Sequence, residues 1–234
     1  HSICVSGAPK VMTDLRFKDL QSRLARSFMK VPVHTRLTCF LCQAYANNFI
    51  SSPYRFTDLS LHMVMSRIIR EVLPQAQGHH VVKLYPTSRY LEPNPFQNAG
   101  SGHIRIVQYF EFRYLRAAFD LIILSSPLST LGWAWSCGKP LIFLDLPENR
   151  LSEEVADEFD HAVFRIDCGV PSWEERLLEL LKLPQSEIYA AWEEKKQRRE
   201  NLSRTHFFGI SRRPGSRVAD FIMDYIRPSL KRTG

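Results

Sequence analysis

From residue 36 onward, short apolar segments alternate with longer segments in which apolar residues recur every three or four positions. A short apolar segment is typical of a buried strand, and the longer periodic pattern is typical of an amphipathic helix. Strands that alternate with helices favour a parallel sheet, because each parallel connection needs a long crossover. The sequence therefore predicts an α/β fold with a doubly wound, mainly parallel, Rossmann-like sheet of about six strands and C-terminal helices.

The predicted strands occupy residues 36–43, 80–84, 104–107, 120–124, 141–144 and 162–166. Two stretches, 121–124 and 141–144, are apolar throughout, as a sheet covered on both faces requires. The predicted helices occupy residues 57–73, 111–118, a segment ending at Cys137, 152–159, 172–181, 186–201 and 216–226. Thr57 or Asp58 is expected to cap the first of these helices.

Sheets of this kind bind their ligands at the carboxyl ends of the strands. The loops after Gln43, Leu84 and Leu124 are therefore the candidate ligand loops. Residues 86–102 are rich in proline, asparagine and glycine and are expected to form a long loop. Long loops in compact domains often carry function.

The turn after the fourth strand combines small hydroxyl residues with the start of a helix. Its hydroxyl residues are Ser125, Ser126, Ser129 and Thr130. Free N–H groups and the positive end of the helix dipole favour an anion at such a turn, and the hydroxyls add donors beside them. Helix capping alone would need one such residue. The turn therefore favours contact with a phosphate or a sugar, with plain capping as the alternative.

Three short motifs follow one another in a fixed order: Val82-Lys83-Leu84-Tyr85-Pro86, then Asp120 with Ser125-Ser126, then Gly138-Lys139-Pro140. Over about residues 36 to 230, their order and spacing resemble the C-terminal domain of B-type glycosyltransferases, a fold with two facing Rossmann-like domains. The resemblance is nearest to the bacterial capsule and teichoic-acid transferases. In that family the first motif is Lys-x-His-Pro, so Tyr85 stands where the family has a histidine that contacts the nucleotide phosphate.

The resemblance implies a domain organisation and a function. The stretch 3–10 resembles the end of the family's N-terminal domain. Residues 1–35 would then be the end of a missing acceptor-binding domain and a linker, and residues 36–230 the nucleotide-donor domain. The implied activity is transfer from a nucleotide-sugar, linked to CMP, CDP or UDP, to a glycan or lipid-linked acceptor in capsule, teichoic-acid or lipopolysaccharide synthesis. The implied location is the cytoplasm or the inner face of the membrane.

Further candidate donor-binding residues lie near the ends of predicted strands. Lys83 ends a strand and is expected to contact a phosphate; the alternative interpretation is an ordinary solvated lysine. Tyr85 can donate one hydrogen bond but cannot carry the positive charge of an imidazolium. The remaining candidates are Gln43, Tyr45, Thr87, Ser88, Arg89 and Glu148. Arginine suits bidentate phosphate contact, and an acidic side chain after a strand suits ribose hydroxyls. For Arg89 and Glu148 the alternative is an ordinary polar surface residue.

The net charge of +7 suits phosphate-rich ligands, nucleic acid or an anionic membrane surface. The basic run 195–199 is interleaved with glutamates and lacks the aromatic residues of stacking platforms, so no nucleic-acid partner is expected. This run and the basic residues near the C-terminus allow peripheral contact with the inner membrane; these are Arg212, Arg213, Lys231 and Arg232.

Neither a metal nor a cofactor is expected. Cys39 and Cys42 form a CxxC, but they fall within a predicted strand, and no second pair has metal-ligand spacing. We interpret them as small buried residues in a reducing compartment. The chain also lacks an Asp-x-Asp motif. Two other functions stay open: a non-catalytic partner domain of a polysaccharide assembly complex, and a sugar-nucleotide epimerase.

Overall fold

The structure, a computed structural model, describes residues 18–43, 45, 57–85, 95–125 and 129–207. Its centre is a six-stranded sheet in which every pair of neighbouring strands is parallel, in the order β3-β2-β1-β4-β5-β6. The strands are β1 Leu37–Leu41, β2 His79–Lys83, β3 Ile104–Val107, β4 Leu121–Leu124, β5 Leu141–Asp145 and β6 Phe164–Asp167. The predicted fold class and all six predicted strands are confirmed.

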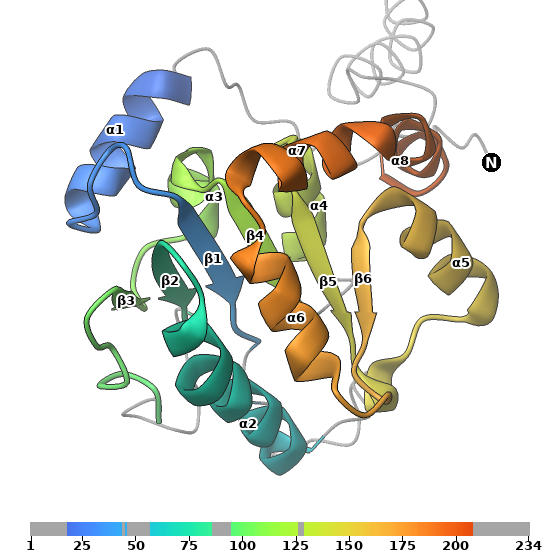
Figure 1. The fold of residues 1–234 in the computed structure, drawn as a ribbon, viewed down its shortest axis with the longest axis horizontal. Helices are drawn as coiled ribbons and strands as arrows, with labels where there is room; N and C mark the ends of the chain where they lie inside the picture. Colours follow the sequence, from blue (N-terminus) through green and yellow to red (C-terminus); the bar gives the residue numbers. More distant parts are fainter. Residues whose placement is uncertain (1–17, 44, 46–56, 86–94, 126–128, 208–234) are drawn as a thin grey trace, which may run out of the picture.

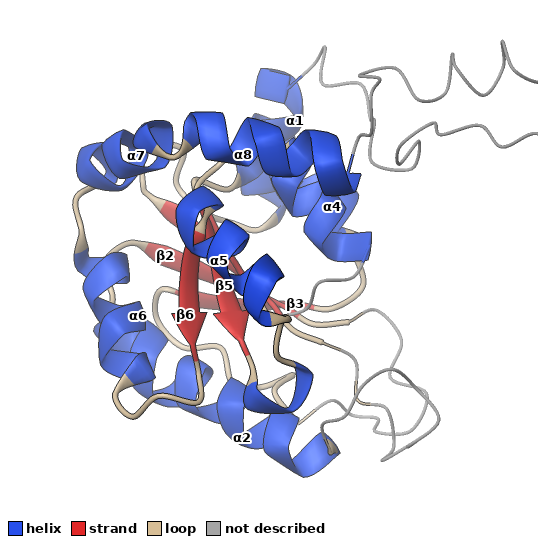
Figure 2. Cartoon of the chain, turned by 90° about the vertical axis from the view of Figure 1, so that its right-hand side faces the viewer, coloured by secondary structure: helices blue, strands red, loops and turns tan. Residues whose placement is uncertain are grey.

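Helices cover both faces of this sheet (Figure 1). In that view α2 and α6 lie in front of the strands, α3 and α4 lie behind them, and α5 lies beside β6. The perpendicular view in Figure 2 separates the same layers. The helices are α1 Lys18–Phe28, α2 Asp58–Arg67, α3 Phe112–Leu115, α4 Ser129–Ser136, α5 Glu153–Ala162, α6 Trp173–Lys182, α7 Gln185–Glu194 and α8 Lys196–Leu202.

The two faces of the sheet bury separate hydrophobic cores, because successive side chains of a strand point to opposite faces. Cys39 and Leu41 of β1 join the core beneath α1, α3, α4 and α5, whereas Phe40 joins the core beneath α2 and α6. All five residues of β1 and all five of β5 are buried. For the apolar residues of these strands, this is the burial expected in a central parallel strand. Thr38 of β1 and Asp145 of β5 are polar residues that are buried as well.

Three predicted helices differ in detail from the structure. The predicted helix 111–118 consists of α3 and a 3-10 turn, Arg116–Ala118. Thr57 caps α2, since its hydroxyl oxygen accepts from the Ser60 amide at 3.1 Å. The predicted helix 57–73 is α-helical only to Arg67 and continues as a π-helical turn, Ile68–Val72. The predicted helix 186–201 is divided at Lys195 into α7 and α8. The predicted helix 216–226 lies outside the described residues.

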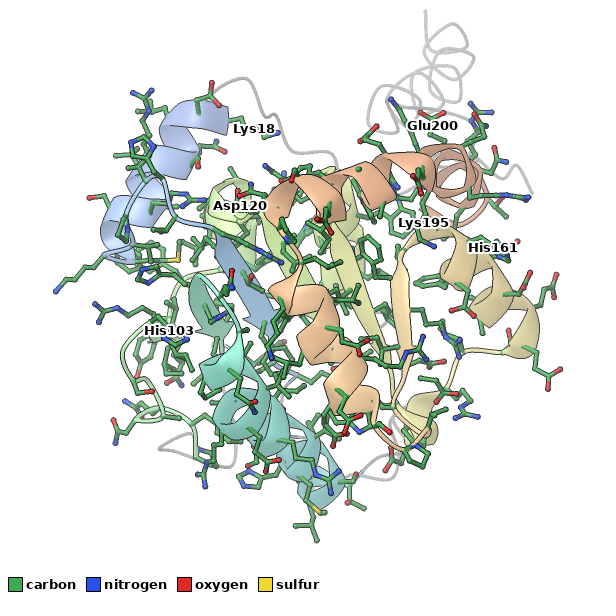
Figure 3. The ribbon with its side chains drawn as sticks, viewed as in Figure 1. Lys18, His103, Asp120, His161, Lys195 and Glu200 are labelled. Atoms are coloured by element: carbon green, nitrogen blue, oxygen red, sulfur yellow. The ribbon has the colours of Figure 1, made fainter. Side chains whose placement is uncertain are left out.

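Helix α1 lies within the segment 1–35, which the sequence assigns to a linker region. It packs on the hydrophobic core that contains Cys39 and Leu41 of β1. Ala25 and Met29 are buried against the sheet. The Arg26 guanidinium donates to Asp120 Oδ2 at 2.8 Å, and the Leu37 amide donates to the same oxygen at 2.8 Å. Asp120, labelled in Figure 3, therefore ties α1 to the amino ends of β1 and β4.

Candidate functional site

The strand order creates a switch point between β1 and β4. The chain leaves β1 toward β2 on one side of the sheet and leaves β4 toward β5 on the other. Where neighbouring strands send their connections in opposite directions, a crevice opens beyond their carboxyl ends, and this crevice is the usual ligand site of open α/β sheets. The loops after Gln43 and Leu124, identified from the sequence, begin at this switch point.

Gln43 and Ser125 meet across the switch point. Gln43 follows β1 and Ser125 follows β4 directly. The Gln43 side-chain amide donates to Ser125 Oγ at 2.8 Å and to the Ser125 carbonyl oxygen at 2.9 Å. A serine hydroxyl has one donor and two acceptor positions. Ser125 Oγ uses an acceptor position toward Gln43, so its hydrogen stays able to donate to another group.

Helix α4 begins a few residues further on, at Ser129. The first four N–H groups of an α-helix have no partner within the helix, and the helix dipole places positive charge at this end. No acidic residue occurs in the first turn of α4, so no carboxylate of that turn competes for these N–H groups. Thr130 is half-buried in this turn. Ser126 lies outside the described residues, and of Ser129 only the main chain is described.

Lys83 ends β2 at the same edge, but its ammonium group is engaged elsewhere. Its side chain is buried, and Nζ donates to the carbonyl oxygens of Leu84 and, at 2.8 Å, of Gln108. Burial lowers the pKa of Lys83 to about 8. In this arrangement Lys83 joins the ends of β2 and β3. Its contact with a phosphate stays a prediction.

The two candidate tyrosines lie in different environments. Tyr85, two residues beyond β2, is 47% exposed and can reach a ligand. Tyr45 is buried, and its hydroxyl lies 3.0 Å from His62 Nδ1. The His62 ring stacks on Phe96 with centroids 4.9 Å apart, and burial raises the pKa of Tyr45. Tyr45 therefore packs in the core, and its role at the donor site stays a prediction.

Glu148 lies beyond β5 in a short 3-10 turn, Pro147–Asn149, and is half-buried. The neighbouring carboxylate, Asp145 at the end of β5, is fully buried and accepts two hydrogen bonds from Arg165 at 2.9 and 2.6 Å. This ion pair joins β5 to β6. Of the two acidic residues at this strand end, Glu148 is thus the more accessible one. The remaining candidates, Thr87, Ser88 and Arg89, lie outside the described residues.

The two cysteines of the CxxC lie in β1 and just beyond its end. Cys39 is buried in β1 and Cys42 is half-buried beyond its end; both are free thiols. Burial raises the pKa of both thiols, which favours their protonated form. Among the described residues no group of three or more His, Cys, Asp or Glu side chains is arranged to hold a metal ion. None of the helices that the structure describes is long and apolar enough to span a membrane.

Sequence reasoning did not find two polar residues beside this edge. His62 packs between Tyr45 and Phe96, as described above, and its Nε2 lies 3.3 Å from Ser66 Oγ. Gln108 is buried beyond β3, and its side-chain oxygen has no hydrogen-bond partner among the described residues. A buried amide oxygen without a partner is costly. Its position one residue after the predicted strand 104–107 is the sequence signal by which Gln108 could have been found.

Comparisons with known proteins agree with the fold. No protein-family model matches the chain, and no curated protein matches it. Among solved structures, the chain is similar to WaaG, a glycosyltransferase involved in lipopolysaccharide biosynthesis, at a TM-score of 0.51 and 16% identity. The match covers 86% of this chain and 50% of WaaG. At this identity, the likeness establishes the fold alone: the chain has the Rossmann-like fold of about half of a B-type glycosyltransferase.

Two weaker likenesses are to proteins of similar kind. The wall teichoic acid polymerase TagF matches at a TM-score of 0.43 and 12% identity, over 92% of this chain and 49% of TagF. The glycosyltransferase SnogD from Streptomyces nogalater matches at a TM-score of 0.39 and 15% identity, over 76% of this chain and 44% of SnogD. The chain thus spans half or less of the length of each of these proteins.

Proposed function

We propose that this chain is the donor-binding domain of a glycosyl- or polyol-phosphate transferase that uses a nucleotide-activated donor. The observation that carries the proposal is the Gln43–Ser125 hydrogen bond at the β1/β4 switch point, beside the start of α4. The Ser125 hydroxyl, and the helix N–H groups that have no partner within α4, support binding of a nucleotide at this edge, because open α/β folds bind nucleotides there. The fold shared with half of a lipopolysaccharide glycosyltransferase supports the same reading.

The chemistry required of this domain is stabilisation of a departing nucleotide. The bond that breaks joins the transferred group to the nucleotide: the anomeric C–O bond of a nucleotide-sugar, or the pyrophosphate P–O bond of a nucleotide-linked polyol phosphate. In both cases negative charge grows on the phosphate of the departing nucleotide. Donors that already point at this position stabilise the transition state without reorganisation. We assign this role to the N–H groups of the first turn of α4 and to the hydroxyls of Ser125 and Thr130. Tyr85 supplies a further donor in place of an imidazolium.

The acceptor, the pathway and the location follow from the resemblance and belong to the same proposal. The acceptor is a glycan or lipid-linked glycan of a capsule, teichoic-acid or lipopolysaccharide pathway, held by a second Rossmann-like domain that faces this edge. The reaction would take place in the cytoplasm or at the inner face of the membrane. The donor is linked to CMP, CDP or UDP and is a substrate, so the proposed reaction uses no resident cofactor.

A second function is favoured by one observation, the engagement of Lys83. The cation that the resemblance places beside the phosphate is buried and donates to two main-chain carbonyl groups. A domain that kept the fold but lost its donor site would look like this at Lys83, and it would serve as a non-catalytic partner in polysaccharide assembly. Binding of a nucleotide separates the two functions.

A thermal-shift panel with CMP, CDP, UDP and UMP tests the proposal. A ligand at about one hundred times its Kd stabilises a protein by about 2.7 kcal/mol. For a chain of this size that corresponds to a rise in Tm of roughly 5 to 10 °C. We expect at least one nucleotide to produce such a rise. A folded chain that responds to none of them would favour the non-catalytic partner.

A further inference from the structure

Helix α1 exposes the side of the helix that an amphipathic helix normally buries. Leu20, Leu24 and Phe28 recur every four residues and form one stripe, and they are 56%, 62% and 50% exposed. The opposite side holds Ala25 and Arg26, which are both buried. A surface helix usually turns its apolar stripe toward the core. In α1 the buried side is instead fixed by the ion pair of Arg26 with Asp120.

The stripe continues onto a neighbouring segment. The Phe28 ring contacts the Phe110 ring, with centroids 4.1 Å apart, and Phe110 is itself 45% exposed. We call Leu20, Leu24, Phe28 and Phe110 the α1 surface. Helix α3, which begins two residues after Phe110, packs against α1. It adds Tyr114, which is 59% exposed. Contiguous exposed apolar patches of this kind mark interaction sites.

The charges around the α1 surface are mainly positive. Lys18, Arg23 and Lys30 are exposed, and Lys18 is labelled at the start of α1 in Figure 3. Asp19 is the acidic residue of the helix, and Glu111, which follows Phe110, forms an ion pair with Arg113. Arg26 does not add to the surface charge, because Asp120 neutralises it. The partner of this surface should therefore combine an apolar layer with negative charge.

We propose that the α1 surface binds to an anionic lipid bilayer. An amphipathic helix that lies in a membrane interface inserts Leu and Phe at the acyl boundary and keeps Lys and Arg at the headgroups. Each cation near an anionic surface adds to the attraction. The proposal stands on α1 and does not depend on the donor site.

The position of α1 suits this role. In Figures 1 and 2, α1 lies at the end of the molecule from which the strands start, and α2 lies at the opposite end. The carboxyl ends of the strands point away from α1 (Figure 1). A chain bound through α1 would keep its carboxyl edge open to nucleotides from solution.

Co-sedimentation of the chain with phosphatidylcholine vesicles, with and without phosphatidylglycerol, tests the proposal. We expect binding that requires phosphatidylglycerol and weakens with salt, as screened charges do. The double variant Leu24→Ser/Phe28→Ser should lower the partition coefficient by about tenfold or more, since each exposed apolar side chain contributes at least that order when buried. Lys18→Gln/Arg23→Gln should lower it by about thirtyfold.

The chain offers a matched control on α2. Leu59 and Met63 are also four residues apart and are 68% and 49% exposed, so Leu59→Ser/Met63→Ser removes similar apolar groups from another surface. This variant should bind vesicles like the unaltered chain. Equal binding by the α1 and α2 variants, or no vesicle binding at all, would overturn the proposal. Self-association that disappears with Leu24→Ser/Phe28→Ser would also overturn it, by assigning the surface to a second copy.

Discussion

The side-chain amide of Gln43 lies 2.8 Å from the hydroxyl oxygen of Ser125, although the two residues are 82 positions apart in the sequence. The contact joins the ends of β1 and β4, the two neighbouring strands whose connections leave in opposite directions. It therefore lies at the switch point of the sheet, where open α/β folds bind their ligands. The proposed donor site is built around this contact.

The Gln43–Ser125 contact should be measurable as a coupling energy. Gln43→Ala and Ser125→Ala should each lower the free energy of unfolding by about 1 kcal/mol, the net contribution of a typical hydrogen bond. The effects of substituting two residues in direct contact are not additive. The loss of unfolding free energy in the double variant should therefore be smaller than the sum of the two single losses, by about 0.5 kcal/mol or more. Urea unfolding of the four proteins gives the coupling. Strict additivity would mean that the contact does not form in solution.

The ion pair between Arg26 and Asp120 should hold α1 on the domain. The Asp120 side chain is 16% exposed and accepts from both Arg26 and the Leu37 amide. Asp120→Asn should destabilise the fold by about 2 kcal/mol or more, because it leaves a buried guanidinium without its anion. Asp157, which is 78% exposed, provides the matched control, and Asp157→Asn should change stability by less than about 0.5 kcal/mol. Equal effects of the two substitutions would contradict this role.

Stability should fall in mild acid because of His80. Burial lowers the pKa of His80 from 6.5 to about 4, with a smaller opposing contribution from a hydrogen bond to Ala76. Between these values the unfolded chain binds the proton that the folded chain does not, so stability is complete above about pH 7 and is lost as the pH falls toward about 4. From about pH 7.5 to 5 the loss from this group is about 2 kcal/mol.

The variant His80→Phe isolates this contribution. It keeps an aromatic ring at the buried position but cannot bind a proton. The difference in unfolding free energy between about pH 7.5 and 5 should be smaller in this variant by about 2 kcal/mol. Chemical denaturation at both pH values provides the measurement. The same pH dependence in both proteins would show that His80 is not the responsible group.

Tyr85 tests whether the proposed donor site works as it stands. Its side chain is 47% exposed at the carboxyl edge of the sheet. The family that the sequence resembles has a histidine at this position. If its hydroxyl donates to the nucleotide phosphate, Tyr85→Phe should weaken nucleotide binding by about tenfold, the effect of losing a hydrogen bond to a charged group. Tyr85→His should also weaken binding. Tighter binding by Tyr85→His would instead indicate a site that has lost its original ligand contact.

The fold could be predicted from the sequence because apolar segments such as 121–124 and 141–144 are short, bounded by turn residues and separated by periodic helices. Helix α1 could not be predicted in this way. Its apolar stripe faces solvent, and its buried side depends on Arg26 meeting Asp120, 94 residues away. The division of the last charged helix at Lys195 also lacks a proline or glycine signal.

The candidate site was predicted in part. The rule that ligand loops follow the carboxyl ends of strands selected Gln43, Lys83 and Ser125, and all three lie at the carboxyl edge of the sheet. Their binding of a donor stays a prediction. The direction in which each side chain points could not be predicted from the sequence. Lys83 turns toward main-chain carbonyls that only the β2–β3 pairing brings near it, and Tyr45 turns toward His62 in the core.

The donor site is tested most directly by calorimetric titration of CMP, CDP and UDP into the folded chain. The same titrations are made with the variant Gln43→Ala/Ser125→Ala. Gln197→Ala is the matched control, since Gln197 is exposed on α8 and bonds to Asn201. We predict that at least one nucleotide binds the unaltered chain and Gln197→Ala alike, and that the double variant binds it about tenfold or more weakly. Absence of binding to all three nucleotides by a chain shown to be folded, or equal binding by the double variant, would contradict the proposed site.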